Sequence, residues 1–119
     1  MTLSQFKAFC LQFKGVTEEY PFDETTLAFK VGGKIFALAD TAQFSSLNLK
    51  CDPEKALELR ARTESVRGGY HMNKKHWNTI DVVGELDDTE LKFWISHAYD
   101  LVFKGLPKKR QAEILESQP

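Results

Sequence analysis

Two short runs of alternating residues, joined by a pair of glycines, constrain the fold of this chain more than any other feature. In residues 26–31 large apolar side chains occupy every second position, and a second run follows over residues 34–39. Alternation with a period of two indicates β-strands. Gly32 and Gly33, which lie between the runs, can both adopt the positive φ angles of a tight turn. The segment therefore predicts an antiparallel β-hairpin.

The same kind of periodicity predicts the other elements. Residues 44–50 and 77–83 alternate and are predicted to be strands. Apolar residues at helical spacing, with capping residues before them, predict four helices. These helices span residues 2–14, 52–63, 87–105 and 107–116. Residues 16–25 are acidic and contain Pro21, which a helix interior does not tolerate, so a connector is predicted there.

The element order, α-β-β-β-α-(loop)-β-α-α, predicts an α+β fold in one domain spanning residues 1–119. Hairpin-linked strands separated from flanking helices favour a two-layer sandwich, a mainly antiparallel sheet with helices packed on one face. The residues expected in the core are Leu27, Phe29, Leu47, Leu49, Ile80 and Val82, with Ala56, Leu57 and Ala61 from the second helix. The opposite sheet face is expected to be polar and to carry Thr26, Lys30, Ser46, Asn48, Lys50, Trp77 and Thr79.

Composition indicates an ordinary globular protein, with 42% hydrophobic and 12% aromatic residues. No apolar run approaches the roughly 18 residues that span a bilayer, and the first residues lack the layout of a secretory signal. We therefore expect a cytoplasmic protein without membrane contact. Cys10 and Cys51 are isolated, and Cys10 lies on the apolar face of the first helix. A reduced, buried thiol is expected there.

Charge is distributed unevenly along the chain. The net charge is −1, which by itself gives no support to nucleic-acid binding. Residues 50–75, however, contain seven Lys or Arg and four Asp or Glu, a local charge of +3 that leaves −4 for the remainder. An acidic stretch lies near the start of the chain, over residues 18–24. Such polarisation can steer a charged partner.

Common catalytic and metal-binding motifs are missing from the sequence. His71 and His76 are five residues apart, and His97 stands alone in the third helix, so no HExxH or CxxC spacing occurs. The sequence contains neither GxSxG nor a P-loop, and neither glycine pair opens a helix after a strand. We expect no metal, no cofactor and no catalysis.

Residues 69–79, Gly-Tyr-His-Met-Asn-Lys-Lys-His-Trp-Asn-Thr, closely resemble the hallmark run of the MmcQ/YjbR family. The resemblance extends in the same order over residues 48–54, Val66 and residues 99–102. It implies a sandwich similar to the "double-wing" DNA-binding C-terminal domain of the phage transcription factor MotA, and to the frataxin-like CyaY shape. Members are commonly labelled DNA-binding on this structural similarity, and the resemblance brings no catalytic residues.

The leading hypothesis is a DNA-binding protein that contacts the phosphate backbone through a local basic surface. Its cations would be Arg60, Arg62, Arg67, Lys74 and Lys75, which could converge on phosphates. Tyr70 or Trp77 could stack on a base or pack on a sugar, and His71, Asn73 and His76 complete the candidate site. Five neutralised phosphates would give log affinity a slope of about −4.5 against log salt.

Several alternatives remain open at this stage. The same polarised surface could serve a protein-interaction module, either a homodimer or a receptor for an acidic protein partner. A small-ligand pocket near His71, His76 and Asn78 is a third reading. Each single residue also has a structural explanation, since exposed lysines solvate surfaces, aromatic residues fill cores, and Asn73 or Asn78 can stabilise a turn.

Overall fold

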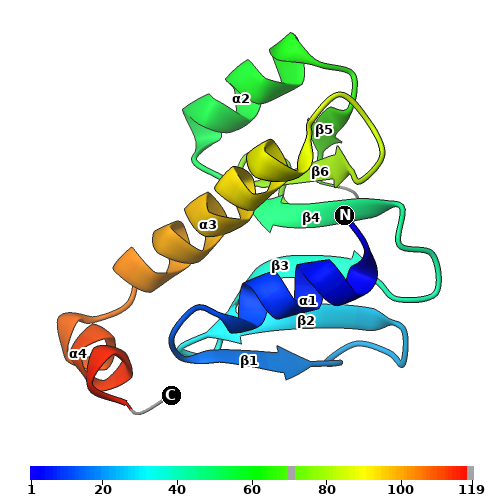
Figure 1. Ribbon diagram of the computed structural model, residues 1–119. Coiled ribbons are helices and arrows are strands. Elements are labelled where there is room, and N and C mark those ends of the chain that lie inside the picture. Colours follow the sequence, from blue (N-terminus) through cyan, green and yellow to red (C-terminus); the bar gives the residue numbers. More distant parts are fainter. Residues whose placement is uncertain (70–71, 118–119) are drawn as a thin grey trace.

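The computed structural model describes residues 1–69 and 72–117. Its helices are α1 (Leu3–Leu11), α2 (Pro53–Arg62), α3 (Asp88–Lys104) and α4 (Lys108–Glu116). Its strands are β1 (Val16–Glu19), β2 (Thr26–Val31), β3 (Lys34–Asp40), β4 (Ser46–Lys50), β5 (Val66–Gly68) and β6 (Trp77–Asp81). The strands form one sheet in the order β1-β2-β3-β4-β6-β5, in which every pair is antiparallel. Helices α1 and α3 cross the same face of this sheet (Figure 1). The predicted α+β sandwich is confirmed.

Local sequence signals placed the helix starts correctly. Thr2 forms a capping box with Gln5, since the Gln5 amide donates to the threonine hydroxyl at 3.1 Å and the Thr2 amide donates to the glutamine side chain at 2.8 Å. Asp52 and Asp87 cap α2 and α3 by accepting bonds from the third residue beyond them, at 3.1 and 2.9 Å. Gly105 ends α3, as predicted.

The predicted hairpin is confirmed. Gly32 and Gly33 have φ angles of 59° and 82°, the left-handed backbone that a tight turn between two strands requires. A Cβ atom on Gly32 would also lie 2.6 Å from a methyl carbon of Leu106, so the turn packs closely against the chain that follows α3. The hairpin is therefore fixed by backbone conformation and by a tertiary contact.

Two strands were not predicted. The connector predicted over residues 16–25 contains β1, which pairs with β2 through Val16 and Val31 at one end. As an edge strand it exposes both middle residues and needs no apolar alternation, so its sequence gave no signal. Strand β5 has only three residues and is held by pairing with β6.

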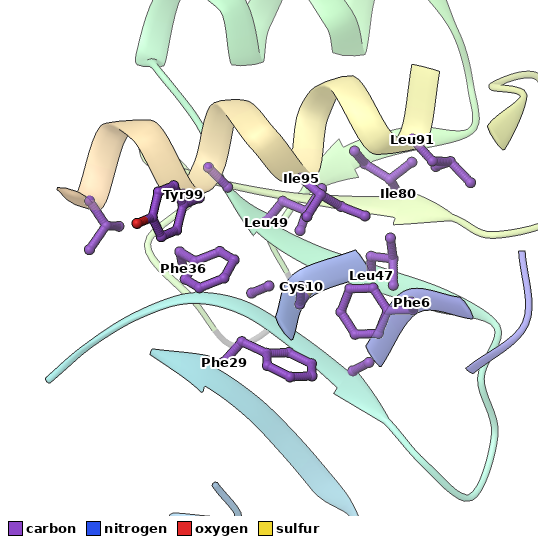
Figure 2. Packing of buried hydrophobic residues seen from close by; sticks show 14 of the residues in the cluster. Phe6, Cys10, Phe29, Phe36, Leu47, Leu49, Ile80, Leu91, Ile95 and Tyr99 are labelled. Atoms are coloured by element: carbon purple, nitrogen blue, oxygen red, sulfur yellow. The ribbon is translucent and has the colours of Figure 1, made fainter. Parts of the chain in front are cut away.

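The core lies between the sheet and the two helices that cross it. All six predicted strand residues are buried in one hydrophobic cluster. Figure 2 shows four of them, Phe29, Leu47, Leu49 and Ile80, with residues of α1 and α3 that belong to the same cluster, namely Phe6, Cys10, Leu91, Ile95 and Tyr99. The Tyr99 hydroxyl donates to the carbonyl of Lys14 at 2.7 Å, which ties α3 to the end of the first helical region. Cys10 is fully buried and unpaired, as expected.

The prediction for the buried face of α2 was right for Ala56 and wrong for Leu57 and Ala61. Ala56 and Leu59 are buried, whereas Leu57 is 63% exposed and Ala61 is exposed. The helix packs chiefly against β5, a strand that the sequence did not reveal, so the orientation of the helix about its axis could not be foreseen. As a result, a large apolar side chain lies on the surface beside the loop that precedes β6.

The sheet face turned away from α1 and α3 is less polar than predicted. Cross-strand pairing aligns Thr26 with Asp40, and a second row joins Ala28, Leu38, Asn48 and Thr79. Ala28, Leu38, Trp77 and Thr79 are buried on this side of the sheet, although the prediction placed Trp77 and Thr79 on a polar face. The Thr79 hydroxyl donates to the Asn48 side-chain oxygen at 2.6 Å.

Candidate functional site

Three of the five predicted phosphate-binding cations gather around one groove. Arg60, Lys74 and Lys75 line a depression of about 350 Å³ between α2 and the loop that precedes β6. The remaining lining residues are Pro53, Glu54 and Leu57, all from α2. We call this depression the α2 groove. Its rim carries three positive charges and one negative charge, and its apolar surface includes the exposed side chain of Leu57.

Arg60 has a structural role within this groove. Its Nε donates to Oδ1 of Asn78 at 2.6 Å, and its Nη2 donates to the carbonyls of Trp77, at 3.1 Å, and of Lys74. Asn78 is only 1% exposed, and its amide also contacts the carbonyl of Ala56 in α2 at 3.4 Å. The arginine therefore joins α2 to β6 and to the loop. Among the described residues, no acceptor bonds to its Nη1.

Arg62 and Arg67 lie outside the α2 groove and are paired with acids. Arg62 binds Glu90 at the start of α3, and Arg67 Nη1 lies 2.9 Å from Oδ1 of Asp81 across the β5–β6 pair. Both arginine side chains remain more than half exposed, so each pair contributes little to stability, about 0–1 kcal/mol. Each pair is nevertheless electrically neutral. The five cations therefore do not form one surface: three line the α2 groove, and Arg62 and Arg67 each lie elsewhere in a neutral pair.

Three other candidate residues, Asn73, His76 and Trp77, make contacts that stabilise the loop or the sheet. Trp77 is only 8% exposed, and the Lys50 ammonium lies 5.5 Å from its ring centre, so the indole is not offered for base stacking. The Asn73 side chain accepts a bond from the Lys75 amide at 2.9 Å, a local turn contact of the kind asparagine favours. His76 holds the loop through its carbonyl, which accepts from the Cys51 amide at 2.8 Å. Tyr70 and His71 lie outside the described residues.

Among the described members of the candidate set, Lys74 and Lys75 have the most accessible positive charges, and Arg60 keeps its charge because its partners are neutral oxygens. Both lysines are exposed, and neither forms an ion pair with any acid in the described part of the chain. Backbone bonds from Asn73 and His76 fix the loop on either side of them. The loop therefore presents two adjacent cations on a structured backbone.

Sequence reasoning missed two residues that shape this site. Asn78 lies in the predicted strand and was considered for a turn or a small-ligand pocket, but its role as the buried acceptor of the Arg60 guanidinium was not predicted. Leu57 was assigned to the core, but it lies in the groove. A signal for Leu57 existed in the spacing of Ala56 and Leu59, which define a different buried face. The sequence contained no signal for the pairing of Asn78 with a residue 18 positions away.

The third histidine of the sequence is also structural. His97 Nε2 accepts a bond from the Asp52 amide at 3.1 Å, which requires an unprotonated ring nitrogen. Burial, together with the nearby positive charge of Lys55, lowers the pKa of His97 below its ordinary value. Within residues 1–69 and 72–117, no three His, Cys, Asp or Glu side chains are grouped as metal ligands. No helix in those residues is long and apolar enough to cross a membrane.

The fold and the groove together define a small two-layer α+β domain with one antiparallel sheet and a cationic surface at its β5–β6 end. A profile of the YjbR family matches residues 11–101, and the chain belongs to this family. An uncharacterised protein from Escherichia coli O157:H7, YbdF, is 36% identical over 109 residues, covering 91% of this chain and 89% of that protein. The uncharacterised YjbR of Escherichia coli K12 is 26% identical over 117 residues, covering 98% and 99%.

Two solved structures of other proteins have the same fold as this chain. The crystal structure of a Deinococcus radiodurans protein with a DUF419 domain is similar at a TM-score of 0.88 and 38% identity, covering 95% of this chain and 87% of that one. A Pseudomonas syringae protein superposes with a TM-score of 0.72 over 86% of this chain and 99% of its own, at 23% identity. The second likeness supports the sandwich architecture alone.

Proposed function

We propose that this chain is a DNA-binding protein that contacts the phosphate backbone through the α2 groove, without catalysis. The observation that carries the proposal is the convergence of Arg60, Lys74 and Lys75 on one depression. Lysine and arginine side chains that neutralise phosphates release counterions, which supplies the free energy of sequence-independent binding. The footprint is smaller than the sequence suggested, because Arg62 and Arg67 are paired and Trp77 is buried.

The smaller footprint changes the expected salt dependence. Three cations contacting phosphates give a slope of about −2.7 for log affinity against log salt, in place of about −4.5. Glu54 also lines the groove and opposes phosphate, which brings the expected slope to between about −1.8 and −2.7. Binding of this kind is weak at physiological salt and measurable at low salt.

Paired variants test the proposal. Changing Lys74 and Lys75 together to Ala removes two exposed cations, while the backbone bond from Lys75 to Asn73 is kept. At 50 mM salt we expect about a tenfold loss of affinity for duplex DNA per lysine. The matched control changes Lys108 and Lys109 of α4 to Ala, which alters the net charge equally at another exposed pair. Equal losses in both variants would show that net charge, and not the α2 groove, governs binding.

A second candidate function is supported by one specific observation, the exposed Leu57. A large apolar side chain surrounded by cations suits an acidic segment of a protein partner, or a second copy of the chain, better than it suits a phosphate backbone. Leu57→Ser separates the two functions, because DNA affinity should be unchanged whereas binding to an acidic partner or self-association should be lost. Sedimentation over a range of protein concentrations measures self-association directly.

A further inference from the structure

A second groove lies on the sheet face turned away from α1 and α3, with a chemistry opposite to that of the α2 groove. It has a volume of about 470 Å³, within the range of small-molecule sites. It is lined by Phe22, Asp23, Thr26, Leu38, Ala39, Asp40, Asn48 and Met72. We call it the sheet groove. It joins the loop between β1 and β2 to the loop before β6, two segments about 50 residues apart in the sequence.

The two carboxylates of the sheet groove are both next to Thr26, one through hydrogen bonds and the other through strand pairing. The Asp23 carboxylate accepts bonds from the amides of Thr25, at 2.9 Å, and Thr26, at 2.6 Å, and from the Thr26 hydroxyl at 3.1 Å. These bonds, with the Thr26 amide first, lower the pKa of Asp23, so it is ionised at neutral pH. Asp40 is the direct cross-strand partner of Thr26, and its carboxylate accepts from the amides of Ala42 and Gln43.

Within the described residues, neither carboxylate is neutralised by an ion pair. In the described part of the chain, no lysine, arginine or terminal amine forms an ion pair with Asp23 or Asp40. The amide groups that hold them are neutral, so the negative charge of both residues remains. On β2, the strand that contains Thr26, Lys30 pairs with Glu19 of β1 at 3.1 Å. One end of the sheet groove therefore favours a cation.

Apart from Thr26 and Asn48, the remaining lining is apolar. Leu38 is 6% exposed and Met72 is half-buried, and together they provide a hydrocarbon surface beyond the two carboxylates. Phe22 is 67% exposed at the rim and adds an aromatic surface to this lining. A ligand that covered Phe22, Leu38 and Met72 would gain free energy from the apolar area removed from water.

We propose that the sheet groove binds a small organic ammonium ion with an apolar body. The ammonium group lies between Asp23 and Asp40, and the apolar body covers Leu38, Met72 and Phe22. Charge complementarity selects the cation, while the hydrocarbon surface rejects small hydrated metal ions, which gain nothing from it. Anionic ligands are repelled, so this site is separate from the proposed DNA contacts of the α2 groove. No bond is made or broken in this binding.

Nuclear magnetic resonance titration of the full chain tests the proposal, with phenethylammonium as the probe. We expect saturable shifts of the backbone amides of Thr26, Leu38, Asp40 and Asn48, all of which belong to the sheet groove. Phenethyl alcohol has the same ring and chain without the charge, and 3-phenylpropionate reverses the charge. Both should bind at least about threefold more weakly if the carboxylates select the ligand.

Two single substitutions test whether the carboxylates of the sheet groove bind the ammonium group. Asp40→Asn keeps an oxygen that can accept from the Ala42 and Gln43 amides and removes the charge, so the fold should be retained. It should weaken phenethylammonium binding about threefold to fivefold. Glu24→Gln is the matched control, since Glu24 is exposed in the β1–β2 loop next to Asp23, carries the same charge as Asp40 and does not line the groove. Equal binding of the alcohol, shifts mapping outside the groove, or equal effects of the two variants would each overturn the proposal.

Discussion

Replacing Arg60 with Ala tests how the α2 groove is built. The change removes the guanidinium that bonds to Asn78 Oδ1 and to the carbonyls of Lys74 and Trp77. Asn78 is 1% exposed, so its oxygen would be left without a partner in the protein interior. An unsatisfied buried acceptor costs about 1–3 kcal/mol, and the lost bonds to the two carbonyls add to that cost. We expect a loss of about 3 kcal/mol in the free energy of unfolding.

Urea denaturation measures this loss, and thermal denaturation should show a fall in Tm of about 12 °C for a chain of this length. Arg62→Ala is the matched control. It also removes an arginine from α2, but Arg62 pairs with Glu90 at the surface and not with a buried oxygen. Its cost should be at most about 1 kcal/mol. If both variants lose the same small amount, Arg60 does not join α2 to β6 in solution and the reasoning is refuted.

A double-mutant cycle isolates the contact itself. Combining Arg60→Ala with Asn78→Ala removes the arginine and the buried oxygen that it satisfies. The double variant should therefore be less destabilised than the sum of the single changes, by about 1–2 kcal/mol. Strict additivity would mean that the two side chains do not interact.

Two further predictions concern the turn of the hairpin and a histidine. Gly32→Ala should cost about 2 kcal/mol or more in urea denaturation, because φ is 59° and the new Cβ would meet a leucine methyl group. Gly33→Ala should cost about 1 kcal/mol, since only its φ of 82° opposes the change. Equal costs for the two variants would contradict the argument that Gly32 packs against Leu106. The pKa of His97 is lowered in the folded state, so the unfolded chain binds the proton more readily and stability should fall as pH drops below about 6.5. His97→Gln should reduce this pH dependence, and an unchanged profile would exclude His97 as its source.

Signals confined to neighbouring residues predicted much of the fold. The hairpin, the helix caps at Thr2, Asp52 and Asp87, and the apolar spacing of α3 each involve residues within a few positions of one another. Such patterns are written directly in the sequence. Strand β1 escaped prediction because its hydrogen bonds come from β2, and its exposed side chains leave no apolar alternation.

The candidate site was harder to predict because its electrostatics depend on distant partners. The sequence correctly indicated a chain polarised in charge, but Arg62 pairs with a residue 28 positions away and Arg67 with one 14 positions away. The buried position of Trp77 likewise depends on the sheet that forms around it. Composition can suggest a basic surface, whereas only the fold determines which cations share it.

The salt dependence of DNA binding tests the central claim most directly. Fluorescence anisotropy with a random-sequence duplex should give a slope of about −1.8 to −2.7 for log affinity against log salt. The Lys74→Ala, Lys75→Ala variant should reduce the magnitude of this slope by about 1.8, while the Lys108→Ala, Lys109→Ala control leaves it unchanged. Absence of binding at low salt, or the same slope in both variants, would contradict a phosphate-binding α2 groove.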